Sequence, residues 1–176
     1  MKADKVIKKV LFADLDGMNN STGFRYVIKD DADFLTDSEE KIIEDLLEDT
    51  TNYCNVMIIF TNNHSYSSTE DLALSSIENN FEYSSTSICF VVDRRLNEIC
   101  LCSEGRAKRK ISNAKCDVIC DNTYIYATKE NNYDYYTCTY KTISQVNTVL
   151  SGGHIAQPMK YIHFERGNRR SYSQNL

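Results

Sequence analysis

The chain has 176 residues, of which 41% are hydrophobic and 26% are charged, and this composition excludes a disordered or collagen-like protein. The length fits one domain with a buried core, since a domain holds about 100–200 residues. The formal net charge of −5 argues against a general binder of nucleic acid or anionic membranes and favours cations as small partners.

The cysteine count limits disulfide formation. There are seven cysteines, an odd number, so they cannot all pair within one chain. Cys89, Cys100 and Cys102 lie among apolar residues, which is typical of free thiols in a strand core. Cys116 and Cys120 share one face of a predicted helix, but without a CxxC motif or a nearby histidine they do not favour a zinc site.

No segment is long and apolar enough to cross a membrane. The longest apolar runs, at residues 56–60 and 88–92, are far shorter than the roughly 20 residues that a bilayer requires. The N-terminus also has no apolar stretch of the kind found in signal peptides. We therefore expect the chain as written to be soluble.

Two helices and a strand are predicted in the first half of the chain. Thr36-Asp37-Ser38-Glu39 is a capping-box pattern, and the apolar stripe behind it predicts a helix at about residues 36–52. The apolar run at residues 55–61 predicts a strand buried on both faces. Ser68 is a typical N-cap for a second helix at about residues 69–81.

The second half predicts a hairpin followed by two helices. Apolar strands at residues 87–92 and 98–102 are joined by a short polar turn. The basic stretch after Gly105 predicts a solvated loop and the first turn of a third helix, whose periodicity continues to about Ala127. A last helix is expected from Tyr135 to Leu150, where Gly152-Gly153 ends it.

Long helices that alternate with apolar strands predict an α/β fold. We expect a three-layer sandwich with a mostly parallel central sheet, one antiparallel hairpin strand and helices on both faces. Along the chain, residues 1–22 are predicted to form an N-terminal arm or edge strand, residues 23–151 the α/β domain, and residues 152–176 a polar, disordered tail.

Chain direction gathers polar residues at the carboxyl edge of the predicted parallel strands, where open α/β sheets bind ligands. Carboxylates that converge in loops suit a hard cation, Ca²⁺ or Mg²⁺, better than zinc. The alternative is that these aspartates cap helices and turns. The residues expected at this edge are Asp30, Asp31, Asp33, His64, Asp93 and Asp134, and among them Asp30, Asp33, Asp93 and Asp134 are the predicted metal ligands.

A second pattern lies near the N-terminus. Residues 9–17 resemble the first motif of the haloacid-dehalogenase phosphatases, an apolar strand that ends in D-x-D-G. The resemblance implies that Asp14 attacks phosphorus and that Asp16 acts as acid and base. Met18 departs from the family pattern, and no convincing lysine or paired-aspartate motif follows.

From about Gly23 to Leu150 the sequence resembles the TPM domain family, which includes thylakoid-lumen and bacterial membrane-tethered proteins. Residues 28–35 are similar to its V-x-D-x-A-x-x-L signature, with Ile28 in the valine position. The similarity continues, in matching order, through the strand at 56–60, the helix start at 66–72, the strand end at 92–95, Gly105 and the turn at 132–136.

This resemblance implies a small three-layer α/β sandwich that binds calcium or magnesium at loop aspartates in some members, and a weak acid phosphatase activity in some. Asp30 and then Asp93 are the positions that it carries over. Asn113 stands where many relatives have an aspartate, which removes any role of that carboxylate. Residues 155–162 resemble the stretch before the membrane anchor of clostridial members, whereas residues 163–176 are polar.

Three functions follow as hypotheses. The first is a divalent-cation-binding, non-enzymatic module that binds a membrane-associated protein partner, in a family whose members are tethered to a membrane and face outward. The alternative is a weak metal-dependent acid phosphatase, in which the ion lowers the pKa of bound water. The third is a haloacid-dehalogenase-like phosphatase that uses Asp14 and Asp16.

Overall fold

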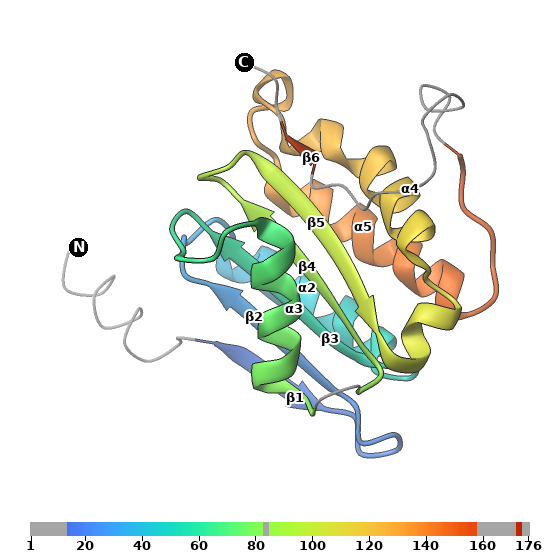
Figure 1. Ribbon diagram of the computed structural model, residues 1–176. Helices are drawn as coiled ribbons and strands as arrows, with labels where there is room; N and C mark the ends of the chain where they lie inside the picture. Colours follow the sequence, from blue (N-terminus) through green and yellow to red (C-terminus); the bar gives the residue numbers. More distant parts are fainter. Residues whose placement is uncertain (1–13, 83–84, 158–171, 174–176) are drawn as a thin grey trace.

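The computed structural model describes residues 14–82, 85–157 and 172–173 (Figure 1). Its sheet contains six strands that stand side by side in chain order. They are β1 (Leu15–Met18), β2 (Arg25–Asp30), β3 (Asn55–Thr61), β4 (Ser87–Asp93), β5 (Glu98–Glu104) and β6 (Tyr172–Ser173). The sheet is mixed: β2, β3 and β4 are parallel, and β1, β5 and β6 each pair antiparallel with their inner neighbour.

Helices cover both faces of this sheet (Figure 1). On one face α2 (Asp37–Thr50), α4 (Asn113–Thr123) and α5 (Tyr135–Leu150) pack over the larger apolar cluster. On the other face α3 (Thr69–Asn80) covers a smaller cluster. The predicted α/β sandwich with its antiparallel hairpin strand and helices on both faces is therefore confirmed. The sheet is mixed rather than mostly parallel, because only the β2–β3 and β3–β4 pairings are parallel and the edge strands pair antiparallel.

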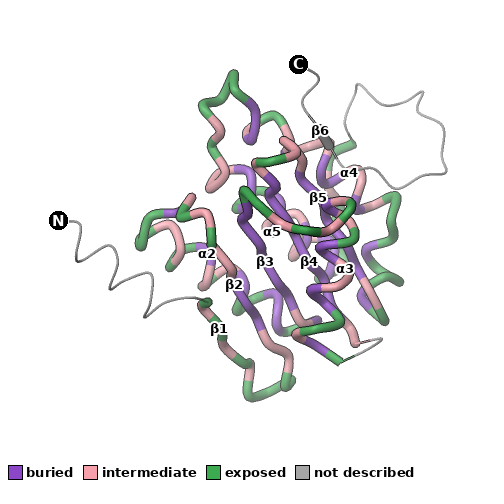
Figure 2. The backbone as a smooth tube through the Cα atoms, turned by 60° about the vertical axis from the view of Figure 1, so that its left-hand side comes forward, coloured by how far each residue is buried: buried purple, intermediate pink, exposed green. Residues whose placement is uncertain are grey.

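The core lies along the central strands, which are buried on both sides (Figure 2). All seven residues of β4 are buried, and β3 is buried from its second residue onward, as expected for parallel strands under two helical layers. By contrast, β1 has no fully buried residue in its four positions. β1 is therefore an edge strand outside the core.

The crossovers between the parallel strands have opposite hands. β2, β3 and β4 follow one another in the same direction across the sheet, yet α2 and α3 lie on opposite faces. Because the hand of a crossover depends on its direction and its face, one of the two departs from the usual right-handed rule. This arrangement leaves one face to α3 and gives α2 a place beside α5.

Local sequence signals place most of these elements. The capping box of α2 is confirmed: the Thr36 hydroxyl accepts from the Glu39 N–H at 3.3 Å, and the Glu39 carboxylate accepts from the Thr36 N–H at 2.8 Å. The Ser68 cap of α3 is also confirmed. The basic segment Gly105–Arg109, predicted as a loop and first helical turn, forms a separate 3-10 helix, and α4 begins only after the Ser112 cap.

Two strands at the N-terminal side are not predicted as such from periodicity. β2 carries a short buried centre, Tyr26–Ile28, between charged ends, so its apolar run is too brief to stand out. β1 falls within the predicted arm or edge strand of residues 1–22, of which residues 1–13 lie outside the described part. In the predicted tail, residues 172–173 pair with β5, and residues 158–171 and 174–176 are outside the described part.

The two neighbouring isoleucines of α2 provide a test of this packing. Ile43 is 0% exposed and Ile42 is 44% exposed. We expect Ile43→Ala to lower the free energy of unfolding by about 2–5 kcal/mol, because it leaves a cavity in the core. Ile42→Ala, the control, should change it by no more than about 0.5 kcal/mol. Urea unfolding measures both, and equal effects would contradict the orientation of α2.

Candidate functional site

The carboxyl edge of the parallel strands brings together the ends of β2, β3 and β4 and the segment before α5. Asp30 ends β2 opposite Phe60 of β3, and Asp93 ends β4 opposite Thr61. Asp134 immediately precedes α5. The predicted acidic residues thus lie at one edge, but the sheet register decides which of them are close to one another.

Asp30 and Asp93 point to opposite faces of the sheet. Side chains alternate along a strand, and Asp30 stands in register with Phe60, which belongs to the cluster under α2 and α5. Asp93 lies one position further along and bonds to Thr69 of α3, on the other face. These two carboxylates cannot bind one ion together in this geometry.

The Asp30 carboxylate closes the turn after β2. Its Oδ1 accepts from the Phe34 N–H at 3.0 Å and its Oδ2 accepts from the Leu35 N–H at 2.9 Å. Burial raises the pKa of Asp30, the two backbone donors lower it, and the nearby carboxylates of Asp33 and Asp31 raise it again. Asp30 therefore caps the turn after β2, and its carboxylate also belongs to a group of aspartates whose negative charges repel one another.

That group extends to Asp14, which precedes the edge strand β1. Burial raises the pKa of Asp14 above its ordinary value, an effect that Lys29 opposes and that Asp31 and Asp16 reinforce. We call Asp14, Asp30, Asp31 and Asp33 the acidic corner. Asp31 and Asp33 are exposed, so the corner is open to solvent cations.

Asp93 is the buried polar centre of the edge, with no exposed side-chain surface. Its Oδ1 accepts from the Leu96 N–H at 3.1 Å, and its Oδ2 lies 2.5 Å from His64 Nε2 and 3.2 Å from the Thr69 hydroxyl. His64 Nδ1 accepts from the Tyr66 N–H at 3.2 Å, which leaves Nε2 as the donor to Asp93. Both ring nitrogens of His64 are used within the fold.

Asp134 is the N-cap of α5. Its side chain accepts from the Thr137 N–H at 2.9 Å. Three of the four predicted metal ligands, Asp30, Asp93 and Asp134, therefore accept backbone hydrogen bonds, which is the capping role considered as the alternative. Over residues 14–82, 85–157 and 172–173, no three His, Cys, Asp or Glu side chains are grouped closely enough to hold a metal ion.

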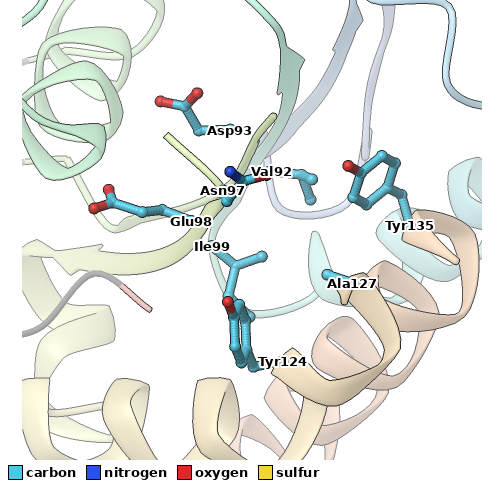
Figure 3. Close-up of a pocket in the computed structure, with 8 residues that line it drawn as sticks. All are labelled: Val92, Asp93, Asn97, Glu98, Ile99, Tyr124, Ala127 and Tyr135. Carbon is cyan, nitrogen blue, oxygen red and sulfur yellow. The ribbon is translucent and has the colours of Figure 1, made fainter. Parts of the chain in front are cut away.

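A small cavity of about 10 Å³ lies between the β4–β5 hairpin and the segment before α5, with room for about one water molecule. Figure 3 shows Asp93 and Glu98 on one side of it and Tyr124 and Tyr135 on the other. The Thr69 hydroxyl also lies 2.5 Å from Glu98 Oε2, so its single hydrogen is shared between the carboxylates of Glu98 and Asp93. A cavity of this size admits no organic substrate.

A larger concave surface of about 460 Å³ lies beside it, and we call it the aromatic hollow. Phe34 and Tyr135 form its floor, with ring centroids 4.7 Å apart. The hollow combines aromatic rings with amide and carboxylate groups, and it is open to solvent. Its lining residues are Phe34, Glu39, Asn131, Asn132, Tyr133, Asp134, Tyr135 and Tyr136.

Arg94, the first residue after β4, contacts two tyrosines of this hollow. Its guanidinium carbon lies 3.6 Å from the ring centroid of Tyr133, in a cation–π stack. Its NH1 group donates to the Tyr135 hydroxyl at 3.2 Å. The sequence alone gives Arg94 no role, and a basic residue beside the predicted edge is the only signal that it offers.

The turn that presents Tyr133 has an unusual backbone. Asn132 and Tyr133 have φ values of 53° and 52°, in the left-handed region that a bulky residue such as tyrosine rarely adopts. Such a conformation costs about 1–3 kcal/mol and persists when surrounding contacts hold it. The stack on Arg94 is one such contact.

The aspartates of the dehalogenase-like motif lie on the edge of the sheet. Asp16 belongs to β1, which pairs antiparallel with β2, and Asp14 immediately precedes it. Their carboxylates lie 4.0 Å from Arg25 and 3.9 Å from Lys29, respectively. In the described residues they are not at the carboxyl end of a central parallel strand, where that chemistry would need them.

The cysteines and helices offer no further chemical site. All seven cysteines are buried and none forms a disulfide, and burial raises the pKa of Cys54 and of Cys138 to about 12, so neither is an available thiolate nucleophile. The helices in the described part of the chain are too short or too polar to pass through a lipid bilayer.

Comparison with known proteins shows similarity in fold. No protein-family model and no curated protein matches the chain. The solution NMR structure of the N-terminal domain of a protein from P. gingivalis matches with a TM-score of 0.62 and 13% identity, over 71% of this chain and 82% of that one. The NMR structure of the BA42 protein from the psychrophilic bacterium Bizionia argentinensis matches with a TM-score of 0.48 and 16% identity, over 78% of this chain and 93% of that one. These are TPM-domain-like structures, and at such identities the similarity concerns the fold alone.

The roles of Asp93 and Asp134 can be separated by stability. We expect Asp93→Ala to lower the free energy of unfolding by about 3 kcal/mol, because it leaves buried donors without an acceptor. Asp134→Ala removes one exposed helix cap and should cost about 1 kcal/mol. Urea unfolding in EDTA measures both, and a loss that appears only with added calcium would contradict these structural roles.

Proposed function

We propose that the protein is a non-enzymatic interaction module that docks a partner protein in the aromatic hollow, with a divalent cation bound at the neighbouring acidic corner. The observation that carries the proposal is the hollow itself, a solvent-open concave surface lined by three tyrosines, two of which contact Arg94. Tyrosine and arginine are enriched at protein interfaces, where they supply much of the binding energy.

The polar groups next to the hollow favour binding over catalysis. A hydrolase needs a base that can reach its substrate, and His64 uses both ring nitrogens inside the fold. Asp93 is fully buried and already accepts from His64, Thr69 and Leu96. The metal-dependent acid phosphatase remains the alternative function, and it would depend on the acidic corner alone.

The acidic corner supports the cation part of the proposal. Ca²⁺ and Mg²⁺ prefer oxygen ligands, and Asp30 with Asp33 supplies carboxylate oxygens from one short turn. Because no three acidic side chains of the described residues are grouped closely enough to hold an ion by themselves, backbone carbonyl groups and water would complete the coordination. Each Asp30 oxygen accepts one backbone hydrogen bond and keeps a further lone pair. Asp31 and Asp14 add charge around this turn, and their repulsion would be relieved by a bound ion. The resemblance to membrane-tethered proteins is the basis for proposing that the partner is membrane-associated.

Calcium binding predicts a stability change. We expect the melting temperature to rise as calcium increases from micromolar to about 10 mM, a range that covers weak sites, because the ion binds only the folded acidic corner. Asp33→Asn should reduce the rise, whereas Asp49→Asn, an exposed aspartate near the end of α2, should leave it unchanged. A melting temperature that stays constant across this range would exclude the cation site.

Docking in the hollow is tested by placing a photocrosslinking amino acid at Tyr136 or, as control, at Tyr53, an exposed residue beyond the opposite end of α2. In the cells that produce the protein, we expect a discrete crosslinked product at Tyr136 that is absent at Tyr53 and weakened by Phe34→Ala. Identical products at both positions would contradict docking in the hollow.

An activity assay addresses the alternative function. We expect no hydrolysis of p-nitrophenyl phosphate with Mg²⁺ or Ca²⁺. Turnover that Asp30→Ala abolishes would replace the proposed module by the metal-dependent phosphatase, and turnover that only Asp14→Ala abolishes would support the dehalogenase-like chemistry.

A further inference from the structure

We propose that Arg94, held by Tyr133 and Tyr135, binds a carboxylate group of the docked partner. The inference deepens the proposed function and rests on it, because it names the chemical group that the partner presents beside the aromatic hollow. Within the described residues, Arg94 is fixed in orientation by the two tyrosines and has no carboxylate partner.

The two tyrosines hold the guanidinium from one face and at one nitrogen. Tyr133 covers a face at 3.6 Å, and the Tyr135 hydroxyl accepts from NH1 at 3.2 Å. A guanidinium has five N–H donors that lie in its plane, and stacking leaves in-plane donors available. The side chain of Arg94 is therefore oriented before a ligand binds. Its loss of conformational entropy on binding is smaller than that of a freely rotating arginine.

No carboxylate in the described part of the chain pairs with Arg94. This holds although acidic residues surround it at the same edge. Asp93, the preceding residue, points into the fold toward His64, and Asp134 caps α5. The fold thus uses its neighbouring carboxylates elsewhere and leaves the charge of Arg94 for an external anion.

The surroundings favour a carboxylate over a phosphate group. One arginine matches one planar carboxylate through two parallel hydrogen bonds. Asp134 and Glu39, which line the adjoining hollow, repel a doubly charged phosphate more strongly than a singly charged carboxylate, as does the net charge of −5. Single-charge anions are therefore preferred.

The position of Arg94 places the proposed carboxylate site beside the aromatic hollow. Tyr133 and Tyr135 both line the hollow and both contact Arg94. If an acidic side chain of the docked partner reached Arg94, the partner's neighbouring residues would lie in the hollow. The expected recognition element is an aspartate or glutamate adjacent to an apolar or aromatic residue.

The test is an NMR titration of the ¹⁵N-labelled protein that follows the Nε–Hε signals of its arginines. The probe is N-acetyl-glutamate α-amide, which carries a single carboxylate, and the uncharged control is the matching glutamine compound. We expect a saturable shift at Arg94 with millimolar half-saturation, no saturable shift at the exposed neighbour Arg95, and no effect of the glutamine compound. Because Arg94→Gln lacks this side-chain signal, the variant is followed by the backbone amide signals of Tyr133 and Tyr135, which should shift saturably in the wild type and not in Arg94→Gln. Arg95→Gln should retain the saturable response.

Several outcomes would overturn the inference. One is a chemical shift of Arg94 that changes linearly with ligand concentration or by the same amount as that of Arg95. Another is saturation of the Arg94 shift at a lower concentration of inorganic phosphate than of the glutamate compound. If Arg94→Gln does not fold, Arg94→Lys serves instead, and the wild-type titration alone still decides. Crosslinking at Tyr136 without a shift at Arg94 would overturn this inference and leave the docking proposal intact. A shift at Arg94 without crosslinking would overturn docking while the anion site remains.

Discussion

The carboxyl edge depends on the buried carboxylate of Asp93. This one side chain joins three segments: the loop after β3 through His64, the start of α3 through Thr69, and the β4–β5 turn through the Leu96 N–H. A buried carboxylate is stable only when its oxygens are bonded, and here these partners bond both of them. The strands can therefore end in polar residues directly above the apolar core.

This saturation has a functional consequence. The residue types that most often act as bases at such an edge, a histidine and an aspartate, are bonded to each other and to the backbone. What faces solvent instead is the acidic corner on one side and the aromatic hollow on the other. Both surfaces are suited to binding an ion or a chain, and neither carries an organised nucleophile–base pair.

The sequence predicts the scaffold better than the site. Strong local signals, the capping box at Thr36 and the apolar runs of β3 and β4, identify elements because they depend only on nearby residues. Chain direction also gathers the aspartates at one edge. Periodicity does not give sheet register, however, and it is register that turns Asp30 and Asp93 to opposite faces. Periodicity also does not predict the contact between Arg94 and Tyr133, because these residues are far apart in the chain.

The hollow and the buried centre are parts of one chain of contacts. Asp93 fixes the β4–β5 turn through the Leu96 N–H, the turn presents Arg94, and Arg94 stacks on Tyr133, whose backbone conformation is unfavourable by itself. Each contact therefore lowers the conformational freedom of the next. A ligand that binds Arg94 would therefore meet a surface whose order comes from the buried carboxylate of Asp93, although Asp93 does not line the proposed binding surface.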